Sequence, residues 1–170
     1  MTRSWRRAIV AVLSPALVAV LVGAPIVSFG ATRTPGDTQV TVFDPEGPFE
    51  RDIDLGKPDF SPADLVFEIH KLLDPNDGTP IGHIYTRIQV MRVLKGGSDF
   101  VFFLDCHVKL AQGTILFNGA AKISDFETGA VFPVTGGTGA YEIARGTVTG
   151  TFATVNGQDG GMLAFDLTTT

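Results

Sequence analysis

The sequence predicts an all-β domain that closes into an antiparallel barrel. Short runs in which apolar and polar residues alternate, rich in Val, Ile, Thr and Phe, recur along the chain from residue 37 onward. Tight turns of Gly, Asn, Asp and Pro separate these runs, and no segment beyond the first 30 residues shows a sustained helical period. Many short strands joined by tight turns are typical of antiparallel barrels, in which closure removes the open edges of the sheet.

Residues 1–30 are expected to be a signal peptide. Three arginines precede the apolar run of residues 8–22, and small residues follow near Gly30. A basic region, an apolar core and a small-residue exit are typical of export signals. The run is short for a bilayer-spanning helix of about 20 residues, so a cleaved signal is favoured over an uncleaved anchor. Adjacent Arg6 and Arg7 fit both Sec and twin-arginine export. We therefore predict a secreted or periplasmic protein.

The mature chain is acidic and has one cysteine. Of the 13 Lys and Arg residues, three lie in the predicted signal, which leaves 10 against 18 Asp and Glu. This balance argues against nucleic acid or an anionic membrane as partner, because phosphate binding needs a basic surface. A single cysteine allows no internal disulfide. The remaining length of about 140 residues is suited to one domain.

Residues 31–60 are predicted to hold the first strand and a proline-rich loop. Residues 37–43 alternate polar and apolar side chains, as a half-buried strand does. Four prolines between residues 44 and 62 predict a loop after this strand.

Residues 61–170 are predicted to complete the single barrel domain. Asn, Asp and Gly between residues 74 and 78 and between 156 and 160 tolerate left-handed backbone angles and mark turns, and Ala111 to Gly113 is read as a three-residue turn. Short helical turns are expected at most at residues 125–129 and 140–144. The predicted strands span residues 65–73, 81–94, 100–110, 114–124, 147–155 and 162–168.

The glycine-rich segment of residues 132–146, FPVTGGTGAYEIARG, allows two interpretations. Its first half is similar to the glycine turn of a dinucleotide site, where a helix N-terminus faces a pyrophosphate. That site needs a third glycine and a βαβ unit, whereas Glu142 stands in the glycine's place and the β-branched residues 147–155 follow. A nucleotide is therefore disfavoured, and no cofactor is expected. The glycines are instead expected to act through backbone geometry, and Arg145 to bind loop carbonyls.

The same segment resembles the signature that plant dirigent proteins carry near their C-terminus, and it is similar to the matching segment of allene oxide cyclases. The resemblance covers about residues 60–155 and implies an eight-stranded antiparallel β-barrel of the calycin-like type, in a bacterial-type secreted member of this superfamily. Both plant families form trimers through barrel faces, so the resemblance also implies a homotrimer. Upstream it rests on DLVF at 64–67, LLD at 72–74, IG at 81–82, residues 100–105 and GTILFNG at 113–119.

The resemblance implies a barrel that holds a small lipophilic molecule and steers its cyclisation or coupling by fixing its geometry. The known catalytic groups are mostly replaced: Ala120 follows Gly119 where dirigent proteins have an acidic residue, and His70 stands at another acidic position. The glutamate of the first strand of allene oxide cyclases falls near Val42 or Asp44. An isomerase-like or cyclase-like enzyme, a non-catalytic carrier of a hydrophobic ligand and a structural barrel without a ligand therefore all stay open.

Strand parity predicts which side chains face the barrel interior, because alternate residues of a strand point to opposite faces. The odd positions of residues 81–94 and 100–110 are largely polar, so the even face is predicted to point inward. The same parity places five large apolar side chains outside, as an interface or beneath the proline-rich loop: Phe67, Ile69, Phe103, Ile115 and Phe117. The predicted pocket residues are Ile84, Thr86, Ile88, Phe102, Leu104, Cys106 and Leu116.

Glu68, His70 and Asn118 are the candidate catalytic residues. Glu68 and His70 are two residues apart and share one face of their strand. An apolar wall around them would shift both pKa values and make the two side chains a plausible acid–base pair. The alternative is a solvated carboxylate beside a polar rim residue. Asn118 stands where the plant families carry a polar cavity residue, and it would orient a ligand oxygen or only satisfy backbone groups at a barrel end. No metal is expected, because the three histidines show no ligand spacing.

Overall fold

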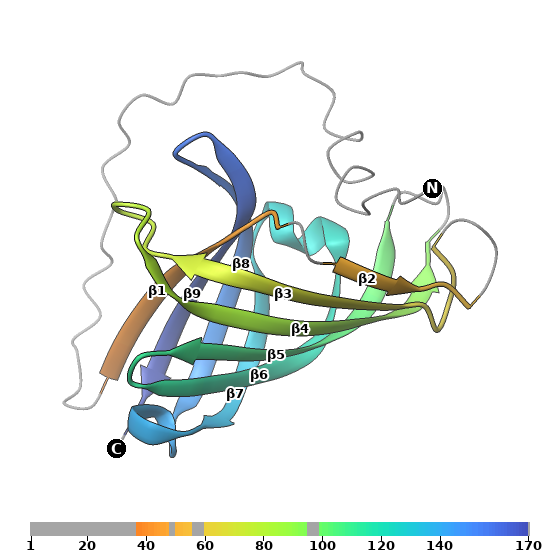
Figure 1. Cartoon of the computed structure of the whole chain (residues 1–170). Coiled ribbons are helices and arrows are strands. Elements are labelled where there is room, and N and C mark those ends of the chain that lie inside the picture. Colours follow the sequence, from red (N-terminus) through yellow and green to blue (C-terminus); the bar gives the residue numbers. More distant parts are fainter. Residues whose placement is uncertain (1–36, 48–49, 56–59, 95–98, 170) are drawn as a thin grey trace. The chain divides into compact units, whose positions relative to one another are not determined.

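The computed structural model describes residues 37–47, 50–55, 60–94 and 99–169 (Figure 1). The predicted signal peptide lies outside these residues. In the described part, no helix has the length and apolar character needed to cross a membrane. This part is a single antiparallel sheet with two short 3-10 helices. The strands are β1 (Asp37–Pro45), β2 (Glu50–Ile53), β3 (Leu65–Leu73), β4 (Pro80–Val93), β5 (Phe100–Leu110), β6 (Gly113–Lys122), β7 (Ala130–Gly137), β8 (Arg145–Val155) and β9 (Gln158–Thr168), and the helices are η1 (Ile123–Glu127) and η2 (Gly139–Tyr141).

Eight of the strands close into a barrel, which confirms the predicted fold class. The strand order is β1-β9-β8-β7-β6-β5-β4-β3-β2, and β1 also pairs with β3 where Phe43 lies opposite Leu73. That last pairing closes the barrel and leaves β2 as an extra strand along the remaining edge of β3. Figure 1 shows β3, β4 and β5 side by side across one side of the barrel, with β8 and β9 beyond them.

Two strands were missed from the sequence. β2 lies inside the predicted proline-rich loop, where its residues, ERDI, show no apolar alternation. β1 pairs with β3 only at Leu73, at the end of β3. The backbone N–H and C=O groups of Leu65 to Glu68 on the same edge of β3 therefore pair with β2. β7 begins just before the glycine-rich segment, and its residues 132–137 belong to that segment.

The glycines of the segment act through backbone geometry, as predicted. A Cβ on Gly137 would collide with the carbonyl of Thr114, and one on Gly139, whose φ is 60°, with the carbonyl of Gln112. After the three-residue η2, β8 returns antiparallel to β7, so the segment is not the βαβ unit of a dinucleotide site. The Arg145 guanidinium donates a 2.7 Å hydrogen bond to the carbonyl of Ala144, which confirms its expected role.

The predicted inward parity is confirmed on three strands and wrong on the fourth. On β3, β4 and β5 the even positions are the buried ones. On β6 the odd positions Ile115 and Phe117 are buried, with 0% and 2% of their surface exposed, so they do not belong to an outer patch. Leu116 and Asn118 lie on the outward face, opposite His107 and Asp105.

A two-residue turn causes this reversal. Leu110 of β5 pairs with Gly113, so only Ala111 and Gln112 form the turn, one residue fewer than predicted. Every even residue of β5 then lies opposite an odd residue of β6, because a register change of one residue moves every side chain to the other face. Cys106, for example, pairs with Phe117.

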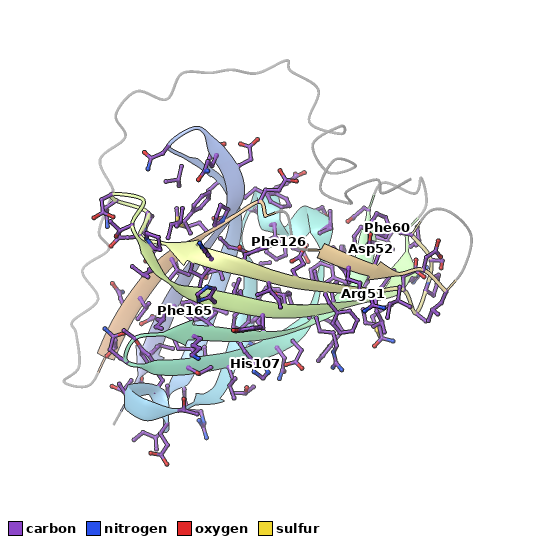
Figure 2. The ribbon with its side chains drawn as sticks, viewed as in Figure 1. Arg51, Asp52, Phe60, His107, Phe126 and Phe165 are labelled. Atoms are coloured by element: carbon purple, nitrogen blue, oxygen red, sulfur yellow. The ribbon has the colours of Figure 1, made fainter. Side chains whose placement is uncertain are left out.

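Aromatic rings fill part of the barrel interior. Phe117 on β6 contacts Phe165 on β9 across the barrel, with ring centroids 5.7 Å apart. Phe126 of η1 packs against Phe102 and Phe132 at centroid distances of 6.1 and 6.0 Å (Figure 2 labels Phe126 and Phe165). A cluster of edge-to-face and tilted rings stabilises a core beyond the burial of its area. The interior is thus divided between this aromatic cluster and the polar residues described next.

Candidate functional site

Two carboxyl groups and one imidazole lie on the inner wall of the barrel. Glu68 and His70 are on the inward face of β3, and only 3% and 4% of their surfaces are exposed. Asp44, 8% exposed, lies at the end of β1. Buried ionisable groups are costly unless they are paired or hydrogen-bonded, so a cluster of them in an apolar wall marks a candidate site.

His70 and Asp44 form a hydrogen-bonded pair. The His70 Nδ1 lies 2.9 Å from Asp44 Oδ1, and the side chains are 2% and 11% exposed. A carboxylate only accepts, so Nδ1 carries the proton, and in the neutral ring Nε2 is then the acceptor. The bond joins β1 to β3 immediately beside the Phe43–Leu73 pairing that closes the barrel. Asp44 therefore fixes both the tautomer and the orientation of His70.

The chain just after β1 holds the other edge of the imidazole. Gly47 packs so closely on this ring that an added Cβ would lie 2.8 Å from Nε2. The neighbouring Glu46 N–H donates a 2.9 Å hydrogen bond to the carbonyl of Asp159 at the start of β9, which anchors this part of the chain. The ring is thus held between a carboxylate and a backbone segment.

Open space lies next to the pair. Gly161 of β9 is the cross-strand neighbour of Asp44, so the two residues share the inward face. A Cβ built on Gly161 would meet no described atom within 4 Å. A methyl group at this position would therefore have room among the described residues beside Asp44.

Glu68 begins a row of inward side chains that runs across four strands. It pairs with Thr86 on β4, which pairs with Cys106 on β5, which pairs with Phe117 on β6. The Cys106 Sγ lies 3.6 Å from the Thr86 Oγ1. Burial raises the pKa of the Cys106 thiol far above its ordinary value, and the charges of Glu68 and Asp44 raise it further. Cys106 is therefore a buried thiol whose thiolate form is disfavoured.

The raised thiol pKa predicts how the cost of Cys106→Ala depends on pH. As the pH rises past the ordinary thiol pKa of 9.0, the unfolded chain loses this proton and the folded chain keeps it. The wild type then loses up to about 1.4 kcal/mol of stability per pH unit, a loss that the alanine variant does not share. Urea denaturation of both proteins should show the cost of the substitution shrinking by about 1.4 kcal/mol between pH 8 and pH 10. A cost that is the same at both pH values would show that the thiol ionises freely in the folded protein.

The structure brings together only some of the residues predicted from the sequence. Glu68 and His70 are on the inner wall, but Asn118 is on the outer face beside Asp105 and does not join them, nor does Leu116 reach the interior. A catalytic role for Glu68 and His70 stays a prediction. The other predicted pocket residues do face inward: Ile84, Thr86, Ile88, Phe102, Leu104 and Cys106.

Asp44 is the site residue that sequence reasoning did not select. The signal was present, because Asp44 continues the alternation of Val40 and Val42 and so shares the face of these apolar side chains. Among the described residues, no group of three His, Cys, Asp or Glu side chains is placed to hold a metal ion. A further buried carboxylate, Asp64, accepts hydrogen bonds from the Ser61 N–H and hydroxyl and from the Leu55 N–H, and it serves to fix the loop before β3.

Comparisons with known proteins identify the fold. No family model matches the sequence, and no curated protein matches it. Among solved structures, pyocyanin demethylase superposes with a TM-score of 0.64 at 19% identity, over 77% of this chain and 100% of that one. A pterocarpan synthase dirigent protein superposes with a TM-score of 0.57 at 15% identity, over 77% of this chain and 82% of its own. The Diels–Alderase AbmU from Streptomyces koyangensis superposes with a TM-score of 0.57 at 13% identity, over 76% of this chain and 68% of its own.

At these identities the likeness establishes the fold alone. The barrel is the one found in dirigent proteins and in Diels–Alderase barrels, and the resemblance read from the sequence is confirmed at that level.

Proposed function

We propose that this protein is a dirigent-like or cyclase-like barrel that holds a small lipophilic molecule against its inner wall and steers its cyclisation or coupling. The observation that carries the proposal is the buried Asp44–His70 hydrogen bond, 2.9 Å long, on an otherwise largely apolar wall with open space beside it. Solved barrels of this fold include a Diels–Alderase and a pterocarpan synthase, which supports a role in ring formation.

The wall is suited to control of geometry. Ile84, Ile88 and Leu104 are buried and apolar, so they exclude water from a bound ligand and restrict its conformations. Holding a reactive molecule in one folded shape removes much of the entropic cost of ring closure. The carboxylate and imidazole would add polarity at one point of this wall.

The Asp44–His70 pair would act as a general base, in which the imidazole of His70 accepts the proton. With Nδ1–H donated to Asp44, the carboxylate holds the imidazole in one orientation and would stabilise an imidazolium formed by proton transfer from a ligand. A cyclisation that takes a proton at one atom and returns it at another needs no redox partner. Glu68 lies on the same face two residues away and would contact the opposite end of such a ligand.

The mature protein is proposed to act outside the cytoplasm. The basic, apolar and small-residue pattern of residues 1–30 supports an export signal, with a mature N-terminus near Ala31. N-terminal sequencing of the secreted or periplasmic fraction tests this, and a full-length chain retained in the membrane would contradict it.

A homotrimer that uses the outer face of the barrel is also part of the proposal. Ile69 and Tyr85 are opposite one another on β3 and β4, each 42% exposed, and Phe103 lies on the same face of β5. Exposed apolar groups on adjacent strands favour an interface. Light scattering should give three times the mass of the mature chain, and a monomer at all concentrations would contradict the trimer.

Incubation with small dienes, dienophiles and epoxides, followed by chromatography and mass spectrometry, tests the activity. Cyclisation would produce new peaks at unchanged mass, and redox-neutral coupling of two molecules by cycloaddition would produce peaks at combined mass. Asp44→Asn and His70→Ala should reduce these peaks by about 100-fold, within the range expected for loss of an acid–base group. His83→Ala, on the outward face of β4, is the matched control and should leave them unchanged.

The outcomes separate three functions. Peaks that depend on His70 and Asp44 support an enzyme. Compounds that bind unchanged identify a carrier, and neither binding nor conversion identifies a structural barrel. Circular dichroism of each variant verifies that the barrel is folded.

A further inference from the structure

The outward side of β3, β4, β5 and β6, called the basic face below, gathers the cations of these strands. Every Lys and Arg of the four strands is exposed on this side. The same strands contain two acidic residues, of which Glu68 points inward and only Asp105 shares the outward side. The five cations of the basic face are Lys71, Arg87, Arg92, Lys109 and Lys122.

Most of these cations have no carboxylate partner. The guanidinium of Arg87 lies 3.6 Å from the carboxylate of Asp105. Within the described ranges, the other four cations form no ion pair. Lys71 and Lys109 each lie opposite His83, on either side of it, although cross-strand neighbours of like charge destabilise a sheet. The basic face therefore has an excess of positive charge that its own residues do not neutralise.

Apolar side chains are exposed between the cations. Ile69 and Tyr85 lie opposite one another and are each 42% exposed, and Met91, at the bulge of β4, is 53% exposed. The next residue in the row of Ile69 and Tyr85 is His107 of β5 (labelled in Figure 2). Tyrosine and aliphatic groups flanked by Lys and Arg are typical of surfaces that lie in the interfacial layer of a bilayer. A soluble polyanion would leave these apolar groups in water, whereas a lipid surface would bury them.

The acidic net charge of the protein does not oppose a contact at this face. The Debye length is about 10 Å at 0.1 M salt, and two packed sheets are already about 10 Å apart without their outer side chains. Carboxylates on the far side of the barrel are therefore largely screened from a membrane that touches the basic face. Net charge averages over both sides of the barrel and does not exclude an anionic membrane at this one.

A second copy of the chain fits the basic face less well than a lipid surface does. β7 and β8 contain no acidic residue, so their outward sides offer no carboxylate to the cations. Two basic faces would repel each other. A homotrimer that covered Ile69 and Tyr85 would exclude lipid from them, so the two occupants compete for this face.

We propose that the basic face docks the protein on an anionic lipid surface. The cations would contact the headgroup phosphates, and Ile69 and Tyr85 would enter the interfacial layer. The docking is independent of the proposed activity. It would place the barrel beside a bilayer, in which lipophilic molecules are concentrated.

Co-sedimentation of the mature protein with lipid vesicles tests this docking. Equimolar vesicles of phosphatidylglycerol and phosphatidylcholine should bind the protein, and vesicles of phosphatidylcholine alone should bind it at least about tenfold more weakly. A salt concentration of about 0.5 M should release it. Replacement of two cations, Lys71→Gln with Lys109→Gln, should weaken binding to the anionic vesicles by about 30-fold.

A matched double variant controls for net charge. Thr41→Glu with Val131→Glu changes the net charge by the same amount at exposed positions of β1 and β7, and it should leave vesicle binding unchanged. Ile69→Ser removes an apolar group from the basic face, so it should weaken binding to vesicles and leave any binding of soluble polyphosphate unchanged. Light scattering and circular dichroism give the mass and verify the fold of each variant.

Three results would overturn the docking. Equal binding to both kinds of vesicle, or equal losses in the two double variants, would show that the cations of this face do not select anionic lipid. Binding of polyphosphate without binding of vesicles would assign the face to a soluble polyanion. A trimer that binds no vesicles would assign it to a second copy of the chain. None of these results bears on the proposed activity, which is measured without lipid.

Discussion

Gly146→Ala is expected to lower the free energy of unfolding by about 3–6 kcal/mol, which is enough to unfold much of the protein at 37 °C. Gly146 is the second residue of β8 and has a φ of 140°, a backbone conformation that residues with a side chain rarely adopt. A Cβ there would collide with the backbone carbonyl of Asp166 on β9, and neither strand can move without breaking the β8–β9 ladder. The free-energy cost of the strained backbone therefore adds to the cost of the collision.

Gly161→Ala is the matched control for this substitution. It lies in the neighbouring β9, has no positive φ, and its added methyl group meets no described atom within 4 Å. We expect the free energy of unfolding to change by at most about 1 kcal/mol. This change includes a stabilising contribution, because alanine lowers the conformational entropy of the unfolded chain. Urea titrations of the two variants measure the difference, and equal midpoints would show that Gly146 is not constrained by its neighbours.

Much of the fold was predictable because its signals are local. β3 and β5 have the predicted bounds, since their side chains alternate and a turn residue stands at each end. The loop at Asn156–Gly157 is shorter than predicted. Both residues have positive φ, 51° and 76°, and form a tight hairpin turn, so β9 begins at Gln158.

The orientation of β6 was not predictable from its own residues. GTILFNG has apolar side chains at both even and odd positions, so alternation does not identify the buried face. The length of the turn at Ala111–Gln112 decides it, and a change of one residue reverses the whole strand. This error moved Asn118 and Leu116 into the predicted site and moved Phe117 out of the core.

The candidate site was predictable in part for a similar reason. Glu68 and His70 follow from the parity of β3, which is a local property. The hydrogen bond to Asp44 joins residues 26 positions apart and depends on the closure of the barrel between β1 and β3. Which strand supplies the hydrogen-bond partner of His70 depends on how the whole sheet closes. The residues of a single strand therefore do not predict it.

Binding of a neutral fluorescent probe to three variants tests the central claim most directly. Ile88, 5% exposed, points inward from β4, and Tyr85, 42% exposed, points outward from the same strand. Ile88→Trp should weaken binding of N-phenyl-1-naphthylamine by about 100-fold or more, because the indole occupies ligand space, at an overpacking cost of about 1–3 kcal/mol where that space is already filled. Gly161→Leu, beside Asp44, should weaken it as well, because the new side chain begins in space where no described atom lies within 4 Å of its Cβ.

Tyr85→Trp adds a similar bulk on the outer face and should leave the affinity unchanged. The account therefore predicts loss of binding in Ile88→Trp and Gly161→Leu, both verified as folded, and wild-type binding in Tyr85→Trp. Loss of binding in Tyr85→Trp, with binding retained in the two inward variants, would place the ligand outside the barrel and contradict the account.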